Sequence, residues 1–280
     1  MLNGAPLGFY SASQLVQDAQ RHNVEVRPPD VMFSDYDCTV EDLPRPPAVR
    51  LGLRQIAKLS QAAAERIVAA RADAPFDGAE DLARRADLDK HEMERLAGAD
   101  ALASLSGHRR QQVWGAAGLR RPPKLLRDAP VDEDYLELPE APEGEAVVHD
   151  YATISLTLRS HPLALLRSRL TELKLRTAAD LHTMPNGRLV RYCGIVTLRQ
   201  QAETANGTIF ISLEDETGVI QVIVWKSLRE QQRPEVLRSR LLAVYGTWQR
   251  DGDATSLIAG RLVDLTWLLG DLPTASRDFR

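Results

Sequence analysis

Aromatic, amide and hydroxyl side chains recur at alternate positions in the segment GTIFISLEDETGVIQVIVW, which spans residues 207–225. Alternation of apolar and polar residues on both sides of an acidic-Thr-Gly break is typical of two strands joined by a tight turn. Phe210, Ser212, Gln221 and Trp225 then share one face. An exposed aromatic ring can stack on a nucleobase, which is worth roughly 1–3 kcal/mol per base, and an amide can hydrogen-bond to it. The spacing predicts a platform for a nucleic-acid strand; the alternative is a face that packs on a neighbouring helix.

Basic residues stand near the ends of the strands around this face. They are Arg191, Arg199, Lys226 and Arg250. Guanidinium and ammonium groups at these positions could follow the phosphates of a bound strand, because phosphate contacts supply most of the affinity of proteins for nucleic acids. The alternative for each residue is a solvated surface charge.

The other residues of the two strands are apolar and predict a core. They are Ile209, Ile211 and Leu213 in the first strand and Ile220, Val222 and Val224 in the second. Glu216, Thr217 and Gly218 are predicted to form the turn, with Gly218 at a positive φ.

Five β-rich segments and one helix are needed to hold this hairpin. In chain order they are RLVRYCGIVTLRQ, TIFISLED, VIQVIVW, the helical KSLREQQRPEVLRS, RLLAVYGTWQRD and TSLIAGRLVDL. Three strands, a helix and two more strands is the order of an OB-fold, a small five-stranded barrel that binds oligonucleotides and oligosaccharides. We therefore expect an OB-fold domain over residues 188–265.

Residues 50–119 have a helical pattern instead. The pattern consists of four short segments separated by few residues, which are QAAAERIVAARA, GAEDLARRA, DKHEMERLAGADAL and HRRQQVWGAAG. Helices this short must be stabilised by packing on one another. Upstream, Ser11 and Gln14 form a capping box at the start of a helix, VEVRP reads as a short strand, and residues 31–47 read as irregular. The predicted fold class is multidomain α+β, with a helical domain and a five-stranded barrel.

An acidic stretch separates the two domains. Residues 128–150 carry nine acidic and no basic residues, whereas residues 50–127 carry 15 basic and 10 acidic residues. We interpret residues 120–187 as an acidic linker followed by a helix that begins at Pro162. Three apolar residues in this stretch either anchor the linker on a neighbouring domain or have no structural role. They are Tyr135, Leu136 and Leu138.

Several classes of protein are excluded by the sequence. No apolar run is long enough to span a membrane and Met1–Tyr10 lacks the features of a signal peptide, so the cytoplasm is the expected compartment. Cys38 and Cys193 form no CxxC pair and are expected to be buried, and the six histidines lack metal-ligand spacing. Nucleotide-binding phosphate loops and GxSxG nucleophile motifs are also missing. The acidic groups at 214–216 and 132–134 are expected to be turn-forming or solvated.

Three strings and their order resemble one family. The strings are RLGLRQIAKLSQAAAERIVAAR, LGFYSASQLVQDAQRHNVEVRPPDV and GTIFISLEDETGVIQVIVW, together with the terminal SRDFR. They are similar to the C-terminal third of error-prone DnaE-type bacterial DNA polymerases, which are C-family, ImuC-like translesion enzymes. The resemblance implies that residues 1–49 end the fingers region or form an adaptor. It implies a tandem helix-hairpin-helix domain at 50–119, and a C-terminal tail at 266–280.

The helix-hairpin-helix motif has two glycines around an apolar residue, followed by a helix whose first N–H groups bind a DNA phosphate. The resemblance places Lys58 and Ser60 at the glycine positions, Leu59 at the apolar position and Arg66 in the helix that follows. Either these residues contact a DNA phosphate, or they belong to a hairpin that is retained only because it packs against the rest of the domain. LAGADAL, at residues 96–102, resembles a second, degenerate copy.

In this family, polymerase chemistry needs three palm carboxylates and magnesium ions in an upstream domain. We find no counterpart, so the chain is expected to be inactive alone and to hold no cofactor of its own. The partners implied by the resemblance are primer-template duplex, single-stranded template, an inactive Y-family-like mutasome protein and, through it, the sliding clamp, with no membrane. Two functions stay open, a DNA-binding region and a protein-interaction region with little affinity for DNA. The hairpin also resembles that of class II aminoacyl-tRNA synthetases, in which the positions of Phe210 and Gln221 face nucleic acid.

Overall fold

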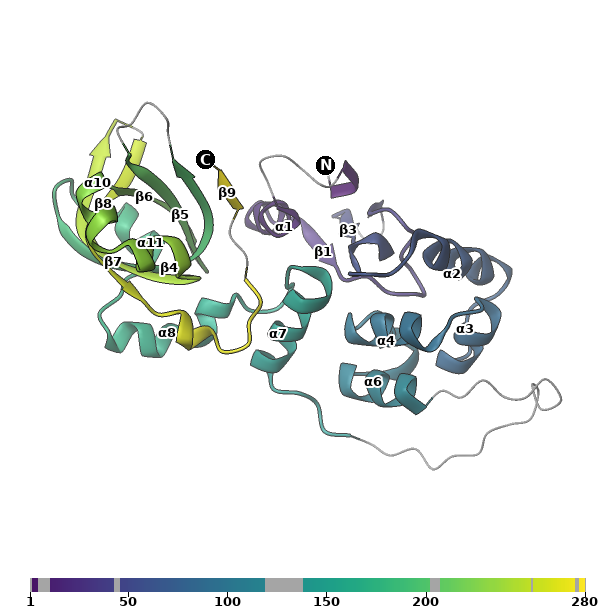
Figure 1. The fold of residues 1–280 in the computed structure, drawn as a ribbon. Helices are drawn as coiled ribbons and strands as arrows, with labels where there is room; N and C mark the ends of the chain where they lie inside the picture. Colours follow the sequence, from purple (N-terminus) through teal and green to yellow (C-terminus); the bar gives the residue numbers. More distant parts are fainter. Residues whose placement is uncertain are drawn as a thin grey trace. The chain divides into compact units, whose positions relative to one another are not determined.

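The computed structural model of the 280-residue chain describes residues 2–4, 11–42, 46–118, 138–201, 207–252, 254–274 and 277–279 (Figure 1). They belong to two compact units, Met1–Leu158 and Arg159–Arg280. Each unit has its own cluster of buried hydrophobic side chains. Within the described ranges, no helix is both long and apolar enough to cross a membrane.

The first unit begins with helix α1 (Ala12–Arg21) and a small sheet. The Ser11 hydroxyl accepts a hydrogen bond from the Gln14 N–H, and the Gln14 side chain accepts one from the Ser11 N–H, which confirms the predicted capping box. The strands of the sheet are β1 (Glu25–Arg27), β2 (Thr39–Glu41) and β3 (Ala48–Arg50). The middle strand β3 is parallel to β1 and antiparallel to β2. Strand β2 lies in residues 31–47, which the sequence predicts to be irregular. The strand was missed because three residues are too few to show an alternating pattern.

Short helices make up the rest of the first unit. They are η2 (Leu53–Gln55), α2 (Gln61–Asp73), α3 (Ala79–Arg85), α4 (Lys90–Gly98), α5 (Ala103–Ser106), α6 (Arg109–Gly118) and α7 (Glu143–Ile154). Ile67 of α2, Leu82 of α3 and Leu96 of α4 are fully buried in one shared core. The predicted helical domain is therefore present, and its helices are stabilised by packing on one another.

Helix α7 lies in the stretch that we had interpreted as linker. Its buried Asp150 carboxylate accepts a hydrogen bond from Arg109 of α6, so the helix is tied to the first unit. Glu143 and Glu145 fall in its first turn, where the positive end of the helix dipole stabilises carboxylates. The same acidic residues that suggested a linker are thus compatible with a helix N-terminus.

The backbone of Leu138 is also held by the first unit. Its N–H donates to Gln111 Oε1 at 3.1 Å, and its carbonyl lies 2.8 Å from His108 Nε2. An anchor at Leu138 therefore exists, although it uses the main chain and not the leucine side chain. Tyr135 and Leu136 lie outside the described residues.

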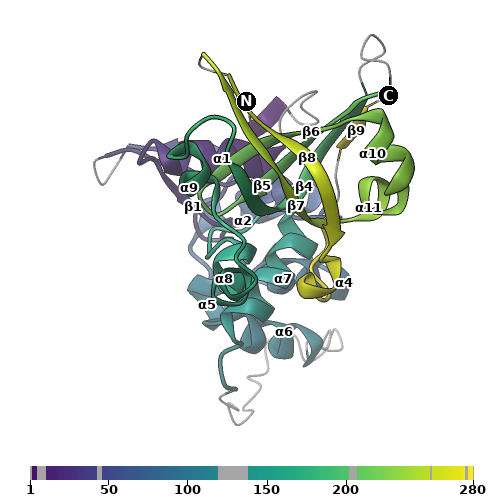
Figure 2. The same cartoon turned by 90° about the vertical axis from the view of Figure 1, so that its left-hand side faces the viewer.

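The second unit is built on a five-stranded barrel with the strand order of an OB-fold. Its strands are β4 (Leu189–Gln201), β5 (Ile209–Asp215), β6 (Gly218–Val224), β7 (Leu241–Asp251) and β8 (Ala254–Asp264). The order around the barrel is β5-β6-β8-β7-β4, and pairing of β4 with β5 closes it. Figure 2 shows β7 and β8 as long curved ribbons whose hairpin extends past the other strands. The predicted five-stranded barrel is confirmed.

Helices and one added strand surround the barrel. The helices are η4 (Thr266–Leu269), α8 (Pro162–Glu172), α9 (Ala178–His182), α10 (Lys226–Gln231) and α11 (Arg233–Arg238). The helix predicted between the third and fourth strands is thus divided in two at Gln232, and Pro234 lies in the first turn of α11. Strand β9 (Arg277–Phe279) was not predicted, and it pairs in parallel with the C-terminal part of β4.

Side chains alternate along β5 and β6 as predicted. Ile209, Ile211, Leu213, Ile220, Val222 and Val224 are all buried inside the barrel. Tyr192 and Trp248 are fully buried in the same core. The apolar half of the hairpin therefore forms the barrel interior.

The turn between β5 and β6 is closed by a side chain, not by a glycine. Glu216, Thr217 and Gly218 all have φ outside the left-handed region, so the prediction of a left-handed, positive φ at Gly218 is wrong. Asp215 Oδ1 instead accepts hydrogen bonds from the Thr217 N–H at 2.8 Å and the Gly218 N–H at 3.0 Å. Gly218 lies close to α9, because a Cβ added there would be 3.4 Å from the Cβ of Ala178.

Candidate nucleic-acid interface

The outer face of β5 and β6 brings together the residues that the alternation predicted. In the register of the two strands, Phe210 is opposite Ile223 and Ser212 is opposite Gln221. Phe210 is half-buried, and Trp225, directly after β6, is 50% exposed. The face therefore offers aromatic and amide groups at the surface of the barrel, as a stacking platform requires.

Ser212 contributes to this face through its neighbour. Its side chain is largely buried, and its hydroxyl donates to Gln221 Oε1 at 3.0 Å. The bond fixes the orientation of the Gln221 amide, whose NH₂ group then points away from Ser212. We infer that Ser212 positions Gln221 and does not itself face a ligand.

The four basic residues predicted around the face have different surroundings. Lys226 and Arg191 are exposed, on the first residue of α10 and on β4 respectively. Arg250 is exposed but donates to the His182 carbonyl at 2.5 Å. Arg199 is buried and donates to the carbonyls of Val236, at 2.7 Å, and Ser239. We leave Arg199 out of the interface, because its guanidinium holds α11 against β4.

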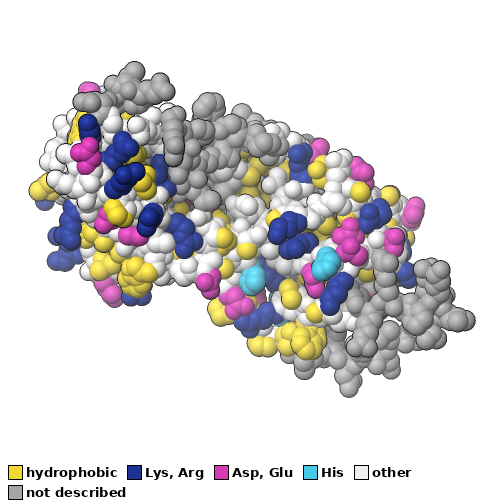
Figure 3. Space-filling model, in the orientation of Figure 1, with side chains coloured by type: hydrophobic (Ala, Val, Ile, Leu, Met, Phe, Trp, Pro, Cys, Tyr) yellow, Lys and Arg dark blue, Asp and Glu magenta, His cyan; other side chains and the backbone are white. Residues whose placement is uncertain are grey.

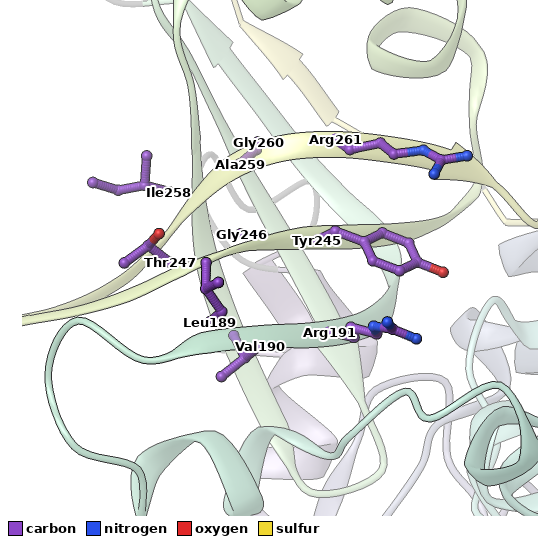
Figure 4. Close-up of a pocket in the computed structure, with 10 residues that line it drawn as sticks. All are labelled: Leu189, Val190, Arg191, Tyr245, Gly246, Thr247, Ile258, Ala259, Gly260 and Arg261. Carbon is purple, nitrogen blue, oxygen red and sulfur yellow. The ribbon is translucent and has the colours of Figure 1, made fainter.

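A second surface lies on β4, β7 and β8, and sequence reasoning did not single it out. An open groove of about 540 Å³ is lined by Leu189, Val190, Arg191, Tyr245, Gly246, Thr247, Ile258, Ala259, Gly260 and Arg261. Figure 4 shows Arg261, Tyr245 and Arg191 one beside another on the three strands, with their side chains pointing the same way. The guanidinium carbons of Arg191 and Arg261 lie 5.2 and 5.7 Å from the centre of the Tyr245 ring. Such distances are those of cation–π contacts.

In the first unit, the hairpin before α2 has the backbone expected of a helix-hairpin-helix motif. Lys58 has φ = +64°, a left-handed conformation that favours glycine, and it is exposed. Ser60 is the N-cap of α2, and its hydroxyl accepts a hydrogen bond from the Ala63 N–H at 3.1 Å. Leu59 packs against the core. The residue types have changed, yet the turn that glycines would form is retained.

Arg66 has a structural role. Its guanidinium donates to both carboxylate oxygens of Glu92, at 3.0 Å each, and to the Ala86 carbonyl at 2.8 Å. The residue joins α2 to the start of α4 and has less capacity for a phosphate than we expected. Asp100, in the degenerate second hairpin, has φ = +61° and accepts a hydrogen bond from Gln112 at 2.7 Å.

The acidic residues of the described ranges form no cluster of three or more that is suited to a metal ion. Each of the three acids at the β5–β6 turn has another role. Asp215 closes the turn, Glu216 accepts two hydrogen bonds from Arg167 at 2.5 and 2.7 Å, and Glu214 is buried with its Oε1 3.5 Å from His161 Nε2. They are therefore turn-forming or paired, and none is a free, solvated carboxylate.

Comparison with known proteins gives these surfaces a context. Residues 23–112 match the helix-hairpin-helix motif, and residues 190–265 match the OB-fold nucleic acid binding domain. Along its whole length the chain is 53% identical to an error-prone DNA polymerase of Ralstonia pickettii and 50% identical to one of Azoarcus sp.. The chain is homologous to the C-terminal part of the error-prone DNA polymerases.

The chain spans 27% of the length of these polymerases. A relative from Alkalilimnicola ehrlichii, 46% identical over 280 residues, is covered to the same extent. A solved asparaginyl-tRNA synthetase from Pyrococcus horikoshii is 23% identical over 29% of this chain and 20% of that chain. Its TM-score is 0.25, a level at which the likeness carries no argument.

Proposed function

We propose that this chain is the DNA-binding region of an error-prone DNA polymerase, acting for an active site elsewhere in the polymerase. Its barrel binds single-stranded template on the outer face of β5 and β6. The observation that carries this proposal is the cluster of Phe210, Gln221 and the half-exposed Trp225 outside a buried core. In OB-folds the second and third strands are those that contact oligonucleotides, and β5 and β6 occupy these positions.

The helix-hairpin-helix unit binds duplex DNA in the same proposal. Support comes from the left-handed turn at Lys58 and from the exposed first residues of α2, Gln61 and Ala62, which follow an exposed ammonium group. Lys58→Gln should then weaken binding to primer-template duplex and leave binding to single strands unchanged.

Fluorescence anisotropy with labelled single strands and primer-template DNA tests the barrel face. Phe210→Ala should weaken single-strand binding by roughly 5- to 150-fold, the loss expected for one stacked base. Trp114→Ala is the matched control, because Trp114 is a 60% exposed aromatic of the first unit. Equal affinities for the Phe210 variant and the wild type would show that the face packs on protein instead.

A protein-interaction function is the second candidate, and a different surface favours it. Leu165 of α8 is 41% exposed, Leu173, directly after α8, is 43% exposed, and Trp267 of η4 is 63% exposed. Between the two leucines, Arg169 has its guanidinium carbon 4.8 Å from the centre of the Trp267 ring. Figure 3 shows hydrophobic side chains gathered over α8 and η4. Exposed aromatic and arginine groups of this kind are enriched at protein interfaces.

We propose that the partner at the exposed surface of α8 and η4 is an inactive Y-family-like mutasome protein, which would connect the polymerase to the sliding clamp. Trp267→Ala should then weaken capture of the purified partner and leave DNA affinity unchanged. Loss of DNA affinity with intact partner capture would assign the surface to DNA instead.

A further inference from the structure

The groove on β4, β7 and β8 brings two guanidinium groups to one aromatic ring, which happens nowhere else in the described residues. In the strand register Arg191 is directly opposite Tyr245, and Tyr245 is directly opposite Arg261. Two guanidinium groups thus flank one ring, at 5.2 and 5.7 Å from its centre. Within the described part of the chain, no carboxylate lies within 4.0 Å of either guanidinium.

Three of the other arginines that contact rings in the described residues are neutralised, whereas Arg169, beside Trp267, has no carboxylate within 4.0 Å in those residues. Arg50, Arg54 and Arg85 each lie over an aromatic ring and also pair with a carboxylate, at 2.7, 2.5 and 3.1 Å. Arg191 and Arg261 hold two like charges beside one ring without such a partner. Like charges held together repel each other, and a bound anion would remove that repulsion.

A β-bulge creates this arrangement. Tyr245 pairs with Arg261 and the next residue, Gly246, pairs with Ala259, so Gly260 is the extra residue on β8. Ala259 faces the core, and regular alternation would direct Arg261 into the core as well if Gly260 took a paired position in the strand. The bulge therefore turns Arg261 outward, beside Tyr245.

The remainder of the groove is largely apolar. Leu189, which is 79% exposed, lies opposite Thr247, and Thr247 lies opposite Ile258. In Figure 4 these three residues lie further along the same strands than Arg191, Tyr245 and Arg261. An apolar floor beside two unpaired guanidinium groups fits a ligand with a flat apolar part and a bridging anion.

We propose that this groove is a second binding site for single-stranded nucleic acid. Arg191 and Arg261 each contact one of two successive phosphates, and the base between them rests on the apolar floor at Leu189 and Ile258. Tyr245 holds the two guanidinium groups apart and orients them. The ligand class rests on the proposed function. The location is new, because β7 is separated from β5 and β6 by β4 on one side and β8 on the other.

A strand bound at both faces must pass around the barrel, so the groove should matter for long strands only. OB-folds occupy about 4–16 nucleotides. The probes are therefore fluorescent oligothymidylates of about 8 and about 25 nucleotides, titrated by anisotropy over a series of salt concentrations. The double variant Arg191→Gln/Arg261→Gln should weaken binding of the long strand at least tenfold at low salt. It should also reduce the magnitude of the slope of log affinity against log salt by about 1.4, at about 0.7 for each lost phosphate contact.

Two further variants separate the groove from general charge effects. Arg233→Gln/Arg238→Gln removes the same charge from exposed arginines of α11 and should leave the slope unchanged. Arg191→Lys/Arg261→Lys should retain most of the slope. Thermal melting of each variant confirms that the barrel is folded.

The outcomes distinguish the two proposals. If the groove variant binds the long strand with wild-type affinity and slope while Phe210→Ala binds weakly, the groove assignment is overturned and the proposed function stands. If Phe210→Ala is unaffected and the groove variant binds weakly, the groove is the single-strand site and the β5–β6 face is not. Competition by polyglutamate as strong as that by oligothymidylate of equal charge would overturn the nucleic-acid assignment in favour of an acidic peptide.

Discussion

The buried carboxylate of Asp215 accepts a hydrogen bond from the backbone N–H of Ala178 at 2.7 Å. Through its other oxygen, the same carboxylate closes the turn between β5 and β6. A single side chain therefore joins helix α9 to the hairpin that carries the proposed DNA-binding face. The position of that face depends on a residue that touches no ligand.

Loss of this carboxylate should destabilise the second unit. Asp215→Ala leaves the N–H groups of Ala178, Thr217 and Gly218 without their acceptor, which should lower the free energy of unfolding by about 3 kcal/mol. Urea unfolding followed by the fluorescence of Trp248, buried in the barrel, measures the change. The exposed Asp251→Ala is the control. Equal stability of the two variants would contradict this role.

The pair of Arg167 and Glu216 should make the second unit less stable in acid. Burial acts to raise the pKa of Glu216, but the hydrogen bonds and charge of Arg167 outweigh it and hold that pKa below its usual value. Stability from this pair is therefore complete above the unfolded pKa of about 4.3 and is lost as pH falls through the lower folded pKa. Unfolding free energies at a series of pH values should fall below about pH 4.5, and fall less steeply in Glu216→Gln. A variant as acid-sensitive as the wild type would exclude the pair as the cause.

The two cysteines should differ in reactivity. Burial raises the pKa of the Cys193 thiol well above its usual value, and the side chain is fully inaccessible beneath the barrel surface. Cys38 is half-buried, so the expectation that both would be buried holds fully for Cys193 only. A disulfide reagent at pH 8 should modify Cys38 in the native protein and Cys193 only after unfolding. Mass spectrometry of the labelled peptides checks this, and fast labelling of Cys193 would contradict it.

Backbone strain at Lys58 should be measurable. A non-glycine residue in the left-handed region costs about 1 kcal/mol, so Lys58→Gly should be more stable than Lys58→Ala by about that amount. Both variants lose the same charge, and the difference therefore isolates the backbone. Urea unfolding of the first unit provides the measurement. Equal stabilities would mean that the surroundings of Lys58 relieve the strain.

Much of the fold could be predicted because hydrophobic periodicity is local. The alternation at Ile209, Ile211 and Leu213 predicted which residues fill the barrel, and the order of strands and helix predicted its type. Strand β9 and helix α7 were missed for a shared reason. The short β9 segment depends on a pairing with β4, and α7 on the buried pair of Arg109 and Asp150, and neither interaction is visible in a local pattern.

The candidate site was predicted less completely. Phe210, Gln221 and Trp225 were found because they share one hairpin. Tyr245 and Arg261 were missed because they reach the same face as Arg191 only through pairing across three strands and a one-residue shift in register. Arg199 illustrates the opposite error, since its position suggested a surface charge although its guanidinium is buried against backbone carbonyls. The glycine in YGTWQRDGDATSLIAGR that precedes Arg261 was the available signal, because an isolated glycine in a strand often marks a bulge.

The extra residue at Gly260 also bends the strand that carries it, because a β-bulge increases the local twist of a strand pair. A homologue that lacks this residue, with every other side chain conserved, would pair Ala259 and Arg261 regularly with Gly246 and Tyr245 and would keep the arginine on the outer face. It would lose the bend and keep the charge. A single-residue deletion in β8 therefore changes the curvature beneath Arg191, Tyr245 and Arg261 without changing their chemistry, and it is a sequence change to look for when relatives differ in how they hold a strand.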